Sequence, residues 1–268
     1  MGLFYKKLQA AWANSGSLLC VGLDPDPDRI PAHIQGERPY FEFCRSIVDS
    51  TAPYSCAFKP QAAHFAAAGR ETELALLIEY IHTHHQAHVV ILDAKRGDVG
   101  STAAFYAREA YGRYGADTVT VSPFLGEESI RPYLEYEERG VTLLCRTSNA
   151  DSDWLQSIGS PPVFERIAAR AVEWNHLGQM MLVAGATYPQ ELGRIRQIVG
   201  DMPLLVPGIG AQGGDLEAVM AQGLDQKGNG LVISSSRGII YADEGTDFAR
   251  AAGREAERTR EEINALRP

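Results

Sequence analysis

Short apolar runs that end in polar or glycine residues recur along this chain, separated mostly by longer stretches in which apolar residues follow helical spacing. The starts of these runs lie 23 to 39 residues apart, which is the length of one strand, one helix and two loops. Alternation of this kind indicates βα units and a parallel sheet. The predicted strands cover residues 18–23, 55–58, 88–92, 117–121, 141–145, 180–183, 203–206 and 230–234.

Helices are expected over residues 41–50, 72–82, 101–114, 162–177 and 214–222, with Ser101 and Asp215 near helix starts as capping residues. A leading helix (3–12) and an Ala/Arg/Glu-rich tail (246–266) would cover the ends or the outside of the fold. Eight units without a linker favour an α/β fold with a single domain over residues 1–268, a (βα)8 TIM barrel. A doubly wound open sheet with extra strands also fits the pattern.

The composition excludes some classes of ligand for such a barrel. The 268 residues carry 25 basic and 34 acidic side chains, for a net charge of −9. This balance argues against broad binding of nucleic acid or of a membrane surface, so any anionic ligand must be held locally. No apolar run approaches the roughly 18 residues of a membrane span. Four widely spaced cysteines and an N-terminus unlike a signal peptide predict a protein of the reducing cytoplasm.

Polar residues gather where the predicted strands end, and this is where parallel α/β folds bind their ligands. Charged side chains are rarely needed there for folding alone, so the strand ends form the candidate site. The residues concerned are Asp24, Lys59, Asp93, Lys95, Ser148, Pro207, Gln212 and Arg237.

The segment ILDAKRGDVGST carries Asp93, Lys95 and Asp98. Strand alternation points Asp93 and Lys95 the same way, and flanking carboxylates keep a lysine protonated and able to act as a general acid. Lys59 ends the preceding strand and would complete an array of alternating charge. A solvated turn of surface charges is the alternative, and Lys59 weighs against it.

A glycine-rich connection, LLVPGIGAQGGD, follows the seventh strand and contains GxGxxG at Gly208, Gly210 and Gly213. It is a weak dinucleotide fingerprint, because no convincing acidic residue follows about 20 positions later. Backbone N–H groups of such glycines can still cradle a phosphate, and Arg237 ends the next strand. Barrel enzymes often bind phosphate with these two loops. The alternative is an ordinary turn with Arg237 in a surface ion pair.

Two other polar segments are better explained by structure. His82, His84, His85 and His88 have no nearby carboxylate or cysteine that would complete a metal site, so we expect a helix end and a solvated turn, and no metal. Residues 25–40 form a long Pro/Asp-rich connection, which we interpret as a surface excursion rather than an active-site wall.

Taken in order, seven motifs between residues 19 and 242 resemble the orotidine 5′-phosphate decarboxylases, in particular their longer bacterial (type 2) branch: VGLDPD, AFKPQ, LDAKRGDVGSTAAFYA, VSPFLGEESIRPYL, CRTSN, VPGIGAQGGD and SSSRGIIYA. The resemblance implies removal of carbon dioxide from orotidine 5′-phosphate to give uridine 5′-monophosphate in de novo pyrimidine biosynthesis. It also implies that the reaction uses no cofactor and no metal.

The resemblance further implies roles for the charged residues. Lys95 would protonate the ring carbon that loses its carboxylate, and Asp93 would lie next to the departing group. Lys59 and Asp98 would complete the array. The protein would be a homodimer in which Asp98 and Thr102 reach into the neighbouring subunit's site.

Binding roles follow from the same resemblance. Asp24 and Lys59 would contact the ribose hydroxyls, and Ser148 the pyrimidine edge, although the adjacent Thr147 is a second candidate. Pro207 would lie against a closing loop. The phosphate would be held by Gln212 and Arg237.

Three other functions stay open at this point. A metal-dependent phosphosugar decarboxylase or synthase of the same superfamily would share DxKxxD, but that branch has an acidic metal ligand where this chain has Lys59. An aldolase could use Lys59 or Lys95 as a Schiff base, although flanking carboxylates keep the amine protonated. A non-catalytic module that binds a phosphate ligand is the third.

Overall fold

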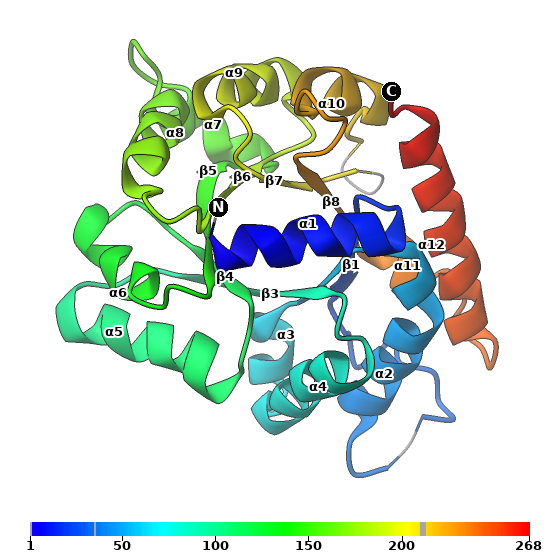
Figure 1. The fold of residues 1–268 in the computed structure, drawn as a ribbon. Coiled ribbons are helices and arrows are strands. Elements are labelled where there is room, and N and C mark those ends of the chain that lie inside the picture. Colours follow the sequence, from blue (N-terminus) through cyan, green and yellow to red (C-terminus); the bar gives the residue numbers. More distant parts are fainter. Residues whose placement is uncertain (1, 35, 210–212) are drawn as a thin grey trace.

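Eight parallel strands, paired in chain order and joined from last to first, close into a barrel (Figure 1). The computed structural model describes residues 2–34, 36–209 and 213–268. All eight predicted strands are present, which confirms the barrel and excludes the open sheet. The strands are β1 (Leu19–Leu23), β2 (Ala57–Pro60), β3 (Val89–Arg96), β4 (Thr118–Val121), β5 (Gly140–Arg146), β6 (Met180–Ala184), β7 (Leu204–Pro207) and β8 (Leu231–Ser235).

Helices between the strands form the outer ring of the barrel (Figure 1). The longer ones are α2 (Pro39–Thr51), α4 (Glu71–His84), α5 (Gly100–Arg108), α8 (Val163–Trp174), α9 (Pro189–Val199) and α10 (Leu216–Gly223). A π-helical turn (Glu109–Arg113) continues α5, and short helices follow several strands. These are α3 (Ala62–Ala67), α6 (Arg131–Leu134), α7 (Asp153–Gln156) and α11 (Arg237–Ile240).

Sequence reasoning missed α9 and assigned one helix cap wrongly. Asp215 caps α10 as predicted, because its carboxylate accepts a hydrogen bond from the Ala218 N–H at 3.1 Å. Ser101 does not cap α5, which starts one residue earlier with Val99 at the N-cap position. The glycine at position 100 has φ +53°, a conformation that favours glycine, and this geometry sets where the helix begins.

The N-terminal helix α1 (Leu3–Ser15) covers the N-terminal ends of the strands and crosses the front of the view in Figure 1. The Tyr5 hydroxyl donates to the Met180 carbonyl at the start of β6 (2.6 Å), and Lys7 pairs with Asp117 just before β4 (2.6 Å). A Cβ at Gly140, the first residue of β5, would lie 2.7 Å from the Phe4 ring, so the helix packs directly on the strand. A ligand therefore has to enter from the opposite end.

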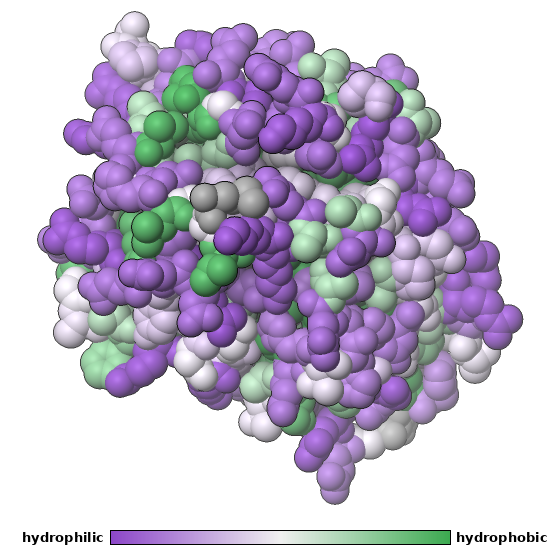
Figure 2. Space-filling view, viewed as in Figure 1, coloured by the Kyte–Doolittle hydropathy of each residue, from purple (hydrophilic) through white to green (hydrophobic). Residues whose placement is uncertain are grey.

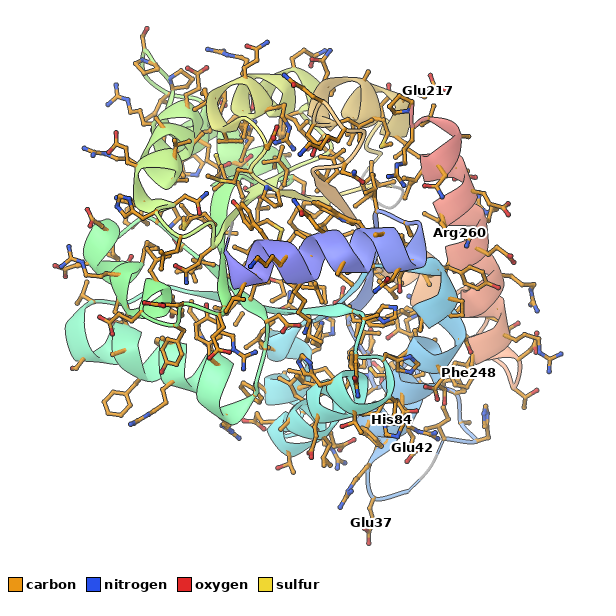
Figure 3. All side chains as sticks on the ribbon, viewed as in Figure 1. Glu37, Glu42, His84, Glu217, Phe248 and Arg260 are labelled. Carbon is orange, nitrogen blue, oxygen red and sulfur yellow. The ribbon has the colours of Figure 1, made fainter. Side chains whose placement is uncertain are left out.

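The C-terminal helix α12 (Phe248–Ala265) packs on the outside of the barrel beside α2. The Phe248 ring stacks on Phe43 with the centroids 5.4 Å apart, and the Arg260 guanidinium lies 5.0 Å from the centre of the Tyr54 ring. Figure 3 labels Phe248 and Arg260 along this helix. The prediction that the leading helix and the tail cover the end and the outside of the fold is confirmed.

The connection between β1 and α2 starts on the barrel and then leaves it. Its first half is anchored by a hydrogen bond from the Asp26 N–H to the Tyr241 hydroxyl (2.6 Å) and by the Arg29–Glu244 ion pair (2.7 Å). Its second half is largely exposed, and Glu37 lies at the outer edge of the molecule (Figure 3). The second half is therefore the surface excursion that we expected.

The histidines lie at the end of α4 and in the following turn. His85 Nε2 is 2.9 Å from Asp49 Oδ1, and His88 Nε2 is 2.9 Å from the Ala52 carbonyl oxygen. Across the described ranges, no three His, Cys, Asp or Glu side chains are grouped so that they could hold a metal ion. The local hydrogen bonds account for these two rings.

The mostly hydrophilic face over α1 and the buried cysteines agree with what the composition predicts. Figure 2 shows the face covered by α1, where most side chains are hydrophilic and apolar ones form small separate groups. In the part of the chain that the structure describes, no helix is long and apolar enough to cross a bilayer. All four cysteines are buried and unpaired, and burial raises the pKa of the Cys20 thiol to about 12.

Candidate active site

The C-terminal ends of β2 and β3 bring three charged side chains together. Lys59 Nζ lies 2.8 Å from Asp93 Oδ2, and Lys95 Nζ lies 2.6 Å from Asp93 Oδ1. One carboxylate thus bridges two ammonium groups, and the cluster carries a net charge of about +1. Lys59 and Asp93 are each only 8% exposed in their side chains, whereas Lys95 is 51% exposed and free to meet a ligand.

The pairing determines the charge state of the buried members. Burial disfavours the charge on Lys59, but Asp93 and Asp24 outweigh it, so the pKa of the Lys59 ammonium lies above its ordinary value. Burial also disfavours the Asp93 carboxylate, but the two lysines outweigh it and its pKa lies below the ordinary value. All of these shifts favour an ion-paired cluster at neutral pH, in which Lys59 is no nucleophile.

Asp24, just after β1, brings to this mouth an acceptor that pairs with no described residue. Its Oδ2 accepts a hydrogen bond from the Ser236 hydroxyl at 2.6 Å, whereas its Oδ1 is buried without a hydrogen-bond partner among the described residues. A buried carboxylate oxygen of this kind is suited to a ligand hydroxyl. Asp24 lines a cavity of about 260 Å³ together with Lys59, Pro207 and Arg237.

The candidate phosphate side is formed by the ends of β7 and β8. Pro207 ends β7 and is half-buried, and Arg237 is exposed at the first residue of α11. Both line the same cavity as Asp24, so the structure brings these two predicted binding residues together with the charged cluster. Gln212 and Gly210 lie outside the described residues.

The hydroxyls of Thr147 and Ser148 differ in how they are used. Thr147 Oγ1 donates to Asn149 Oδ1 at 2.7 Å and accepts from Gln156 Nε2 at 2.9 Å. The Ser148 hydroxyl makes no hydrogen bond to a described residue, so it is the one available to a ligand. The Ser148 backbone lies against Gly185, where a Cβ would come within 2.7 Å of Ser148 Cα.

Asp98 and Thr102 lie apart from the cluster of their own chain. Asp98 Oδ1 accepts from the Val99 N–H at 2.8 Å, and within the described ranges it forms no ion pair with Lys59 or Lys95. Thr102 is exposed on α5. Asp93 and Lys95 both lie on β3, which ends at Arg96, whereas Asp98 lies beyond it in the connection to α5.

Sequence reasoning missed two residues that shape the site. Thr120 on β4 donates to Asp93 Oδ1 at 2.9 Å, and the fully buried Arg146 at the end of β5 holds the loop that carries Ser148. Thr120 stands in a run, TVTV, that reads as an ordinary strand. Arg146 lies in the motif CRTSN, and an arginine that ends an apolar strand was the available signal.

Comparison with known proteins shows which family the chain belongs to. The model of the "Orotidine 5'-phosphate decarboxylase / HUMPS family" matches residues 17–252. The chain belongs to this family. The match contains every residue discussed above for the site, including the Lys59–Asp93–Lys95 cluster.

Individual relatives within this family are orotidine 5′-phosphate decarboxylases. The orotidine 5′-phosphate decarboxylase of Azoarcus sp. (strain BH72) is 55% identical over 98% of this chain and 99% of its own length. That of Ralstonia pickettii (strain 12J) is 54% identical over the same shares. The solved OMP decarboxylase of Leishmania donovani is 37% identical, superimposes with a TM-score of 0.85 and covers 99% of both chains.

Proposed function

We propose that this chain decarboxylates orotidine 5′-phosphate to uridine 5′-monophosphate, a step of pyrimidine biosynthesis, and that Lys95 supplies the proton. Support for the activity comes from family membership and from relatives about 55% identical over nearly the whole chain. The observation that carries the mechanism is the Lys59–Asp93–Lys95 cluster at the mouth of the barrel.

In this mechanism the bond between the ring carbon and the carboxylate breaks, and its electron pair stays on the ring carbon. Carbon dioxide leaves, and the Lys95 ammonium transfers a proton to the same carbon. An ammonium group fixed by Asp93 interacts more strongly with the growing negative charge than with the substrate ring, which is selective stabilisation of the transition state. Asp93 would face the substrate carboxylate before it departs.

The binding residues have separate tasks in the proposal. The unpartnered Asp24 Oδ1 accepts from a ribose hydroxyl, and the buried Lys59 donates to the ribose. Ser148, whose hydroxyl has no partner among the described residues, hydrogen-bonds the pyrimidine edge. Arg237 binds the phosphate together with Gln212, and Pro207 lies against the loop that closes over the ligand.

We further propose that the active form is a homodimer in which Asp98 and Thr102 complete the neighbour's site. Asp98 does not engage the lysines of its own chain, and Thr102 is exposed next to it. Large apolar side chains are exposed nearby at the start of α5, on α5 itself and on the loop after β4, and the 3-10 turn that continues this loop (Glu127–Ser129) contacts α5. They are Val99 (44%), Phe105 (60%), Phe124 (76%) and Leu125 (45%). A second copy of the chain would bury them.

Complementation between inactive variants tests the shared site. A Lys95→Ala chain and an Asp98→Asn chain are each expected to lack turnover as homodimers. When they are mixed, a hybrid contains one site with both native residues, so about one site in four regains activity after random exchange. A mixture that stays inactive, although hybrids form, would refute the transfer of Asp98 across the interface.

The metal-dependent alternative is tested by a chelator. Lys59 places a positive charge at the end of β2 that repels a cation, so product formation from orotidine 5′-phosphate should be unchanged by excess EDTA. Strict dependence on magnesium would refute the proposal. Location in the reducing cytoplasm also remains part of the proposal, supported by the four unpaired cysteines.

Lys95→Ala distinguishes an enzyme from a binding module. The variant should still bind uridine 5′-monophosphate, because the phosphate and ribose contacts remain, while turnover collapses. Unchanged turnover would remove Lys95 as proton donor. Trapping of a covalent adduct by borohydride would instead favour a Schiff-base aldolase, which the ion pairing of both lysines opposes.

A further inference from the structure

A single buried hydroxyl connects the reactive groups of the site to the barrel wall. Thr120 lies on β4 and is fully buried. Its Oγ1 donates to Asp93 Oδ1 (2.9 Å) and accepts from the backbone N–H groups of Ala94 (3.0 Å) and Lys95 (2.9 Å). A hydroxyl has one hydrogen and two lone pairs, so these three bonds use its whole capacity.

We propose that Thr120 is the positioning residue that fixes the Asp93 carboxylate and the Lys95 ammonium relative to the reacting ring carbon. Thr120 is too deeply buried to touch the substrate, so it acts only through its two neighbours. The inference rests on the proposed function, because it concerns the geometry of the proton donor in that reaction.

The need for this hydroxyl arises from the irregular end of β3. The β3–β4 ladder pairs Leu92 with Val119 and next Arg96 with Val121. Three residues of β3 therefore stand opposite one residue of β4, and that residue is Thr120. Two consecutive N–H groups in this bulge have lost their regular ladder partners, and buried N–H groups require another acceptor.

The bulge also gives Lys95 an unusual backbone conformation. Its φ is +45°, the left-handed region, and among the described residues no other residue except glycine has a positive φ. A conformation of this kind persists only where the surroundings hold it. The hydrogen bond from the Lys95 N–H to Thr120 holds the backbone, and the 2.6 Å ion pair with Asp93 holds the other end of the side chain.

Loss of the Thr120 hydroxyl would free both the Asp93 carboxylate and the Lys95 backbone from β4. Asp93 Oδ1 would keep Lys95 as its partner but lose the bond that ties it to β4, and the two N–H groups would lose their acceptor. Displacement of a reacting group by about 1 Å can lower a rate on the order of 100-fold. Substrate binding by Asp24, just after β1, and by Arg237, the first residue of α11, would be largely retained.

Three variants of β4 test the role. Thr120→Val keeps the size and removes the hydroxyl, and we expect kcat to fall on the order of 100-fold while KM changes by less than about threefold. Thr120→Ser restores the hydroxyl and should return kcat to within about fivefold of the wild type. Thr118→Val is the matched control, because the only described residue that the buried Thr118 hydroxyl bonds is Thr142 (2.8 Å), and this variant should leave kcat within about twofold.

The outcomes separate this inference from the proposed function. If Lys95→Ala abolishes turnover but folded Thr120→Val keeps kcat within about threefold, the positioning role is refuted and the proposed function stands. If Lys95→Ala itself retains turnover, the proposed function fails. An equal loss of kcat in Thr118→Val would mean that β4 acts through general packing, which also refutes the role. Should Thr120→Val not fold, Thr120→Cys, a weak donor of similar size, should lower kcat about tenfold; wild-type kcat in that variant would overturn the inference.

Discussion

The buried Arg146 predicts a measurable link between stability and substrate binding. Its side chain has no exposed surface, and its guanidinium contacts Glu191 of α9, Asp153 of α7 and the Ser152 hydroxyl. It also lies 3.5 Å from the centre of the Tyr188 ring. Arg146→Met keeps most of the stem and removes all of these polar contacts at once.

The exposure of the carboxylates paired with Arg146 determines how much stability Arg146→Met loses. Removal of one member of a buried ion pair typically costs about 3–5 kcal/mol, because the other member is left without compensation. Here Asp153 is 61% exposed and Glu191 26% exposed, so both carboxylates regain water when the arginine is lost. We therefore expect the lower end, about 3 kcal/mol, which corresponds to a fall in Tm of about 6–12 °C for a chain of this size.

Equilibrium urea unfolding followed by circular dichroism measures this loss. The control is Arg170→Met, whose partner Glu173 and own side chain are both about 60% exposed, and which should change stability by less than about 0.5 kcal/mol. Arg146→Met should also raise KM, because Arg146 and Gln156 fix the backbone just before Ser148. A stability loss below about 1 kcal/mol for Arg146→Met would refute the reasoning.

Three further changes test other contacts of the site. Gly185→Ala should destabilise the protein by about 1–3 kcal/mol and raise KM, because the new Cβ would meet the Ser148 backbone; Gly36→Ala, with open space around it, should be silent in the same assays. Ser148→Ala should raise KM about tenfold with little change in the stability measured in urea, and an unchanged KM would contradict the proposed pyrimidine contact. The lowered pKa of Asp93 means that its stabilisation is complete above the ordinary carboxyl pKa of about 3.9 and is lost as the pH falls through the folded-state pKa. Urea midpoints should therefore fall more steeply below about pH 4 in the wild type than in Asp93→Asn, and parallel curves would argue against the shift.

The barrel was predictable because strands and helices have different hydrophobic periods, and most of the eight units show a strand pattern followed by a helix pattern. The missed helix α9 shows the limit of that signal. Its mid-helix glycine, Gly193, weakens the helical pattern, and the reason for the glycine lies in another element. A Cβ there would stand 2.5 Å from Gln222 Oε1 of α10, so the glycine lets the two helices pack closely without moving that side chain.

The site was predictable as far as strand ends converge. Lys59, Asp93 and Lys95 meet because neighbouring parallel strands end at the same rim. The bulge that twists Lys95 into the left-handed region was not predictable, because alternation assumes a regular strand. Thr120 was missed for the same reason, since only the bulge gives its hydroxyl three partners.

The burial of every cysteine has a practical consequence for experiments on this protein. A thiol reacts as its thiolate, and burial keeps the native thiols protonated and out of reach, as the raised pKa of Cys20 illustrates. A cysteine introduced on the surface, for example Phe105→Cys on the exposed side of α5, would be the one readily labelled position in the molecule. Maleimide labelling or oxidative cross-linking at that position would then report subunit association without removal of any native cysteine.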